Sequence, residues 1–135
     1  MNFGLKALAV ATAALALAPA AYAGDATAGA KVFKKCKACH KIGDGAKNGV
    51  GPNLTGVIGR TAGTEEGYKY SKSMKAAGAA GLVWDESKIV AYLENPTKYL
   101  RANLNDPKAK AKMSFKLRKA KDRENVAAYL ATFTK

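Results

Sequence analysis

The chain has 135 residues and carries 23 lysines and arginines against 10 aspartates and glutamates, which gives a formal net charge of +13. No linker, repeat or low-complexity block divides it, so a multidomain protein is excluded. Glycine and alanine are plentiful and large aliphatic side chains are scarce. A core made only of side chains would be thin for this length.

Residues 1–23 have the pattern of a secretory signal peptide. A lysine at position 6 precedes a short apolar run over 7–17, and the small-residue site Ala21-Tyr22-Ala23 follows. The run is shorter than the roughly 20 residues that span a bilayer. We expect cleavage after Ala23, with an uncleaved anchor as the alternative. The mature single domain, residues 24–135, would then lie in the bacterial periplasm or an equivalent oxidising space, without stable membrane insertion.

A first helix is predicted from Asp25, which can cap it, towards Cys36, with Gly29 and Phe33 on one face. It leads into the sequence CKACH at residues 36–40, which holds both cysteines and the only histidine of the chain.

This motif is compatible with three kinds of site. A redox-active dithiol normally follows a strand in a βαβ pattern, and none precedes this motif. A closed zinc site needs four ligands, and Cys36, Cys39 and His40 provide three. Covalent attachment of a haem uses all three groups: both thiols bind the vinyls, and the adjacent imidazole binds the iron. The sequence therefore favours one haem c, bound through Cys36 and Cys39, with His40 as a ligand. Such a large flat apolar group would also complete the thin core.

The remainder of the chain predicts loops and then four more helices. No strand pattern appears, so the fold class is all-α, with about five helices and long loops around one haem. The expected elements are loops over Gly43–Gly63, a short helix over 72–77 that stops near Gly78, a helix capped by Asp85, a helix with Asn95 as its cap and Pro96 as its first residue, and a last helix capped by Asp122 with Val126, Tyr129, Leu130 and Phe133 on one face.

The second axial ligand is predicted to be Met113. Because the chain has no second histidine, bis-histidine ligation within it is excluded. Past residue 23 there are two methionines. Met74 lies in a helical pattern and suits ordinary packing, whereas Met113 lies in a loop that can reach over the open haem face, with Phe115 shielding it. A thioether ligand favours ferrous iron and fills the sixth position.

These landmarks resemble the class I c-type cytochromes, and most of all the soluble bacterial cytochrome c2 type. The resemblance covers nearly all of residues 24–135. Besides CKACH, it rests on Gly51-Pro52-Asn53-Leu54, Gly59-Arg60, Gly67-Tyr68-Lys69-Tyr70-Ser71, Trp84, the stretch from Tyr92 to Tyr99, and Lys112-Met113-Ser114-Phe115.

The resemblance implies roles for several further residues. Pro52 would offer its carbonyl to Nδ1–H of His40, as a ligating imidazole requires. Tyr92 would hydrogen-bond the Met113 sulfur. The haem propionates, which need donors or a cation when buried, would be surrounded by Arg60, Tyr70, Ser71 and Trp84.

The positive charge brackets the two predicted ligands, at Lys34, Lys35, Lys37 and Lys41, and again at Lys98, Lys108, Lys110, Lys112, Lys116, Arg118, Lys119 and Lys121, and this set is called the Lys-rich face. An exported protein rarely meets nucleic acid, so we expect acidic protein partners, steered to the exposed haem edge. By resemblance, a monomeric one-electron carrier would shuttle between a cytochrome bc complex and a photosynthetic reaction centre or cytochrome oxidase. The alternatives are a small peroxidase-like haem enzyme and a gas-binding haem protein, both with an open iron position.

Overall fold

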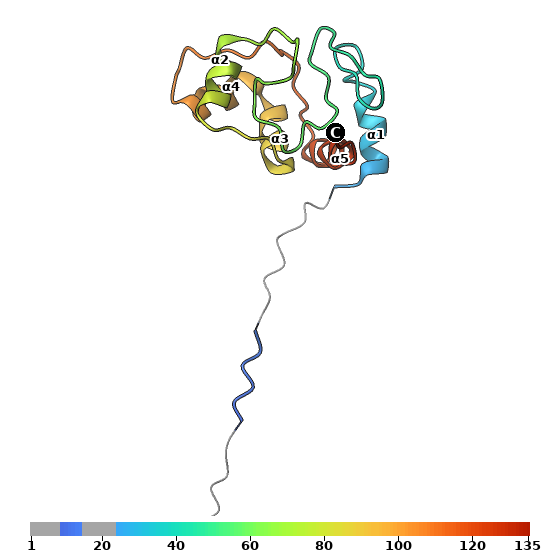
Figure 1. The fold of residues 1–135 in the computed structure, drawn as a ribbon, viewed down its shortest axis with the longest axis vertical. Helices are drawn as coiled ribbons and strands as arrows, with labels where there is room; N and C mark the ends of the chain where they lie inside the picture. The colour runs from blue at the N-terminus through green and yellow to red at the C-terminus, as the bar shows by residue number, and fades with distance from the viewer. Residues whose placement is uncertain (1–8, 15–23) are drawn as a thin grey trace, which may run out of the picture.

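The computed structural model describes residues 9–14 and 24–135 (Figure 1). The predicted signal peptide lies mostly outside the described residues, and its described part, 9–14, forms neither helix nor strand. Within the described ranges, none of the helices has the length and apolar character needed to cross a bilayer. The helices are α1 (Ala26–Phe33), α2 (Lys72–Ala79), α3 (Glu86–Glu94), α4 (Pro96–Leu104) and α5 (Ala120–Ala131).

The predicted all-α class is confirmed for these described ranges. Their only β-type pairing is an isolated antiparallel bridge between Thr61 and Val83. Residues 34–71, between α1 and α2, form a long region of turns and bends, as the glycine-rich sequence over Gly43–Gly63 predicts.

Side-chain caps fix where most helices begin, and three of the predicted caps are confirmed. The Asp25 carboxylate accepts from the backbone N–H groups of Thr27 and Ala28 at 2.8 and 3.2 Å, before α1. Asp85 and Asn95 cap α3 and α4 in the same way, with Pro96 as the first residue of α4. These caps satisfy N–H groups that have no partner within the helix.

The prediction for the last helix is wrong at both ends. The last helix begins at Ala120, after Lys119, which makes no side-chain cap. Asp122 lies inside the first turn, where a carboxylate interacts favourably with the positive end of the helix dipole. That helix ends at Ala131, so Phe133 lies beyond it. The short helix ends at Ala79, near Gly78 as predicted and two residues beyond the predicted 72–77. A Cβ on Gly78 would overlap the Ala62 carbonyl oxygen, so glycine is needed there for close packing.

The helices pack in a chain of neighbours that Figure 1 shows from α1 to α2. The first helix packs on α5, α5 on α3, and α4 on both α3 and α2. Gly29 allows the two helices to approach closely, because a Cβ there would overlap the Asn125 carbonyl oxygen and lie 2.7 Å from Tyr129 Cβ. The Phe33 and Tyr129 rings add a contact with centroids 5.4 Å apart.

Asn95 joins two helices, which makes it a test of local stability. It follows the last residue of α3, and its side chain accepts from the N–H of Lys98 at 3.1 Å to begin α4. We expect Asn95→Ala to lower the free energy of unfolding by about 1 kcal/mol, the usual loss for an N-cap. Denaturant unfolding measures this value, and a change near zero would contradict a stabilising cap.

Candidate functional site

A cavity of about 370 Å³ lies between the region of turns that follows α1 and the segments that carry α3 and Met113. It is called the central cavity here. Its walls are mainly apolar and aromatic, a composition typical of sites for large organic ligands. The residues that line it include Cys36, Cys39, His40, Pro52, Arg60, Tyr68, Tyr70, Ser71, Met74, Trp84, Tyr92, Lys112, Met113 and Phe115.

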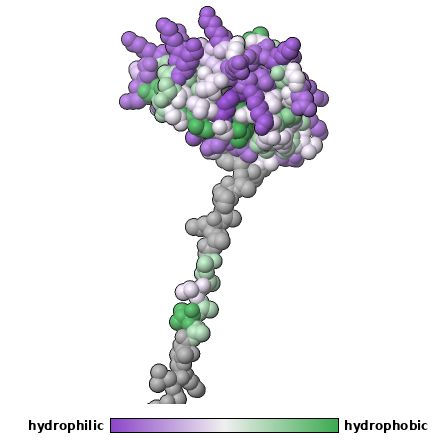
Figure 2. All heavy atoms as spheres, viewed as in Figure 1, coloured by the Kyte–Doolittle hydropathy of each residue, from purple (hydrophilic) through white to green (hydrophobic). Residues whose placement is uncertain are grey.

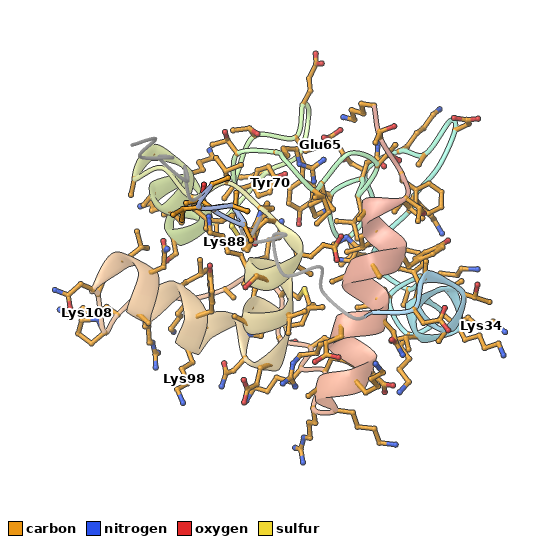
Figure 3. The ribbon with its side chains drawn as sticks, turned by 90° about the horizontal axis from the view of Figure 1, so that it is seen from below. Lys34, Glu65, Tyr70, Lys88, Lys98 and Lys108 are labelled. Carbon is orange, nitrogen blue, oxygen red and sulfur yellow. The ribbon has the colours of Figure 1, made fainter. Side chains whose placement is uncertain are left out.

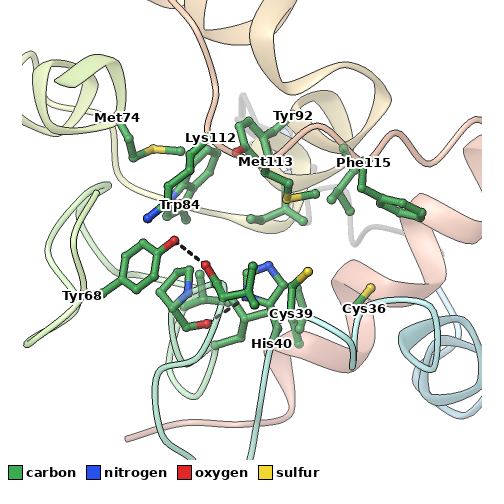
Figure 4. Close-up of a pocket in the computed structure, with 18 of the residues that line it drawn as sticks. Cys36, Cys39, His40, Tyr68, Met74, Trp84, Tyr92, Lys112, Met113 and Phe115 are labelled. Atoms are coloured by element: carbon green, nitrogen blue, oxygen red, sulfur yellow. Dashed lines mark hydrogen bonds between the residues drawn. The ribbon is translucent and has the colours of Figure 1, made fainter. Parts of the chain in front are cut away.

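The turns after α1 bring the CKACH motif to one side of the central cavity. Cys36 N–H donates to Phe33 O at 2.8 Å, and His40 N–H donates to Cys36 O at 2.9 Å, so the chain coils tightly through the motif. Neither cysteine forms a disulfide. Figure 4 shows their sulfurs and the His40 ring on the same side of the cavity.

His40 is held by its two neighbours in the Gly51-Pro52 turn. Its Nδ1 lies 2.9 Å from the Pro52 carbonyl oxygen, the contact that the resemblance implied. A Cβ on Gly51 would lie 2.7 Å from that same Nδ1, so only glycine leaves room for the ring. Burial lowers the pKa of His40, although the Pro52 hydrogen bond opposes this shift. The neutral imidazole, which is the form that binds metals, is therefore favoured.

The thiols do not have the electrostatic environment of a redox dithiol. Burial, reinforced by the nearby Cys39, raises the pKa of Cys36, whereas reactive C-x-x-C motifs lower it. The described residues, 9–14 and 24–135, contain no named strand, so they provide no βαβ unit around the motif. Within the described ranges, no three His, Cys, Asp or Glu side chains are grouped so that they could hold a metal ion.

Met113 lies on the opposite side of the central cavity from His40 (Figure 4). Its segment is anchored nearby, because Leu117 N–H donates to Leu93 O at 2.8 Å and the Leu117 side chain is buried. Tyr92 and Phe115 line the same side. Burial raises the pKa of Tyr92, so its hydroxyl stays protonated and able to donate a hydrogen bond.

Known proteins similar to this chain in sequence and structure agree with this geometry. The cytochrome c family profile matches residues 26–134. This chain belongs to the cytochrome c family. It is 49% identical to a cytochrome c2 of Cereibacter sphaeroides, over 96% of this chain and 95% of that protein, and 50% identical to the full length of one from Rhodobacter capsulatus. A crystal structure of Rhodobacter sphaeroides cytochrome c2 matches with a TM-score of 0.78 and 48% identity, over 82% of this chain and 96% of that one.

Family membership establishes the class I cytochrome fold, the cofactor and the general role of this cytochrome. It carries covalently attached haem c and is an electron carrier, not an enzyme. Its residues fit the group: the apolar cavity is lined by two cysteines that form no disulfide and have C-x-x-C-H spacing, beside an imidazole whose neutral form is favoured. The cradle at Gly51, which any Cβ would fill, leaves that imidazole its place.

The four residues that the resemblance places around the propionates all line the central cavity, but most have partners within the chain. Arg60 Nη1 donates to Asn53 O at 3.0 Å and pairs with Glu65. The Tyr70 hydroxyl accepts from Glu65 N–H at 3.0 Å, and the Ser71 hydroxyl caps α2 by accepting from Met74 N–H. Trp84 is buried, with its ring 5.0 Å from that of Tyr92.

Sequence reasoning missed several contributors to the cavity wall, among them Tyr68, Lys112 and Met74. Tyr68 donates its hydroxyl proton to Val50 O at 2.7 Å, and the Lys112 ammonium lies 4.6 Å from the centre of its ring. Met74, assigned to ordinary packing, also lines the central cavity. The quoted motifs contained Tyr68 and Lys112, so the signal was present, but the Tyr68–Val50 contact spans 18 positions and the contact with Lys112 joins residue 68 to residue 112.

Proposed function

We propose that this cytochrome is a diffusible periplasmic one-electron carrier whose haem iron is ligated by His40 and Met113. The placement of these two side chains on opposite sides of one cavity, with both cysteines beside His40, is the observation that carries the proposal. Bound haem supplies an iron that gains or loses a single electron.

The protein side chains would do the rest. Cys36 and Cys39 would form the two thioethers, and the Pro52 carbonyl would fix the tautomer and ring orientation of His40. Met113 would supply its thioether sulfur as the second protein ligand of the iron. The buried Trp84 and Tyr92 exclude water from the interior, while Cys39 and Phe115 are exposed and mark the open rim.

The purified, exported, haem-loaded protein tests this proposal through its visible spectra in both oxidation states. We expect a pyridine haemochrome of the thioether type, the weak long-wavelength absorption of a methionine–iron bond, and no carbon monoxide binding to the reduced protein. A colourless protein with free thiols would contradict haem attachment. Ready carbon monoxide binding would instead favour a gas-binding protein or haem enzyme with an open position.

We further propose that electrons come from a cytochrome bc complex and pass to a photosynthetic reaction centre or a terminal oxidase through the Lys-rich face. Every member of this face is exposed. Figure 2 shows that hydrophilic side chains cover much of the face in view, and Figure 3 shows Lys34 on the α1 side and Lys98 and Lys108 on the α4 side. Such a charge distribution favours rapid encounter through a small polar interface.

The steering role gives a testable expectation for Lys37, which lies between the two cysteines. At low ionic strength we expect Lys37→Glu to slow the reaction with an acidic partner several-fold, because long-range attraction raises association rates by 10-fold or more. Lys75→Glu, at an exposed residue of α2 outside the cavity lining, is the control with the same charge change. Stopped-flow kinetics at rising salt should remove the difference. Equal slowing by both variants would contradict a localised docking face.

A further inference from the structure

Glu65, in the turns before α2, holds a carboxylate that is almost shielded from solvent. Its side chain is 8% exposed. Arg60 Nη1 pairs with one of its oxygens, and Lys135 Nζ contacts both, at 2.9 and 2.8 Å. A buried carboxylate is costly unless cations or donors surround it, and these two side chains meet that need.

The two cations lie in different surroundings. The Arg60 side chain is 12% exposed and lines the central cavity, whereas the Lys135 side chain is 54% exposed. Water screens the outer pair with Lys135 far more than the inner pair with Arg60. Glu65 therefore connects a cation at the cavity wall to one at the surface.

Further contacts hold this arrangement in place. Glu65 N–H donates to the Tyr70 hydroxyl at 3.0 Å, and Figure 3 shows the two residues in the same part of the molecule. Lys135 reaches Glu65 because its segment docks on the loop: Gly56 N–H donates to Phe133 O at 2.9 Å. A Cβ on Gly56 would lie 2.9 Å from Lys135 Cγ, so the lysine stem lies directly on the backbone.

We propose that Glu65 is a positioning residue that holds the Arg60 guanidinium at the wall of the central cavity and, with Lys135, sets the net charge beside the haem and so its reduction potential. The inference goes beyond the proposed partners and axial ligands. It requires only the haem that members of this family carry.

The sign follows from Coulomb's law. Ferric iron has one more positive charge than ferrous iron, so positive charge nearby favours the ferrous state and raises the potential. The group formed by Arg60, Glu65 and Lys135 has one net positive charge when all three are ionised. Glu65→Gln leaves two, and Lys135→Gln leaves none.

The experiment is a redox titration of the haem-loaded protein and its variants at low ionic strength. We expect Glu65→Gln to raise the potential, Lys135→Gln to lower it by a smaller shift that fades with added salt, and the double variant to return towards the parent protein. Glu66→Gln is the matched control, because it removes the same charge at the adjacent, exposed position. Its shift should be smaller than that of Glu65→Gln.

A second readout separates potential tuning from simple stabilisation. Hydrogen exchange at the Gly56 amide reports docking of the segment that carries Lys135. Faster exchange or easier unfolding in Glu65→Gln, with a potential equal to that of Glu66→Gln, would make Glu65 merely structural and overturn the proposal. Should Glu65→Gln fail to fold, Lys135→Gln decides at an exposed side chain, because an unchanged potential at low salt would overturn the proposal.

Discussion

Replacing Met113 by alanine is expected to leave one axial position of the haem iron without a ligand from this chain. The reduction potential should fall, because a thioether stabilises ferrous iron, and the reduced protein should then bind carbon monoxide. Met113 is partly buried, so the loss of packing should also lower the free energy of unfolding by about 2 kcal/mol, the low end for methionine truncation. Visible spectroscopy, redox titration and denaturant unfolding measure the three effects.

Met74→Ala is the matched control for this change. Met74 also lines the central cavity and is partly buried, so its truncation removes the same atoms from the same wall. We expect a comparable loss of stability while the methionine–iron absorption remains and carbon monoxide stays excluded. If Met74→Ala abolished that absorption and Met113→Ala preserved it, the axial ligand would have been assigned to the wrong residue.

The sequence predicts the helices where local chemistry alone decides them. Asp25 and Asp85 accept backbone hydrogen bonds from residues two or three positions ahead, so their effect depends on neighbours in the chain. The start of α5 could not be found in this way, because Lys119 offers no capping oxygen. Asp122 is a good cap by residue type, but it lies inside the first turn of a helix that packs on α1 and α3, and the local sequence does not encode those contacts.

The candidate site likewise has one part that the local sequence predicts and another that it does not. The CKACH spacing places two thiols and an imidazole together because five consecutive residues turn tightly after α1. The pairing of Arg60 with Glu65 could not be predicted, although the residues are five apart. Glu65 and Glu66 are adjacent residues of the same type, and only the folded structure shows that Glu65 is the shielded one. The contact of Lys135 with Glu65 spans 70 positions, and no periodicity in the sequence encodes it.

Gly51, which lines the central cavity, is the site of the other prediction with a large effect. Gly51 lies against the His40 ring, and a Cβ there would be 2.7 Å from Nδ1 and 2.8 Å from Nε2. Gly51→Ala must therefore push the imidazole away from the Pro52 carbonyl or displace the turn, whose Gly51 N–H donates to Cys39 O at 2.7 Å. We expect less haem attached per chain, and unfolding that is easier by about 1 to 3 kcal/mol, as for other overpacked sites.

Gly49→Ala separates this steric effect from the general effect of losing a glycine. Its Cβ would have Cys39 O as its nearest neighbour, at 3.6 Å, which is an ordinary contact. Haem content by pyridine haemochrome and the stability of the loaded protein should then match the parent protein for Gly49→Ala and fall for Gly51→Ala. Both variants add one methyl group, at positions only two residues apart. A difference between them therefore reports what that methyl group contacts, and for Gly51 the contact is the histidine ring. Equal haem content and stability in the two variants would show that the ring has room to move, and that Gly51 does not fix its position.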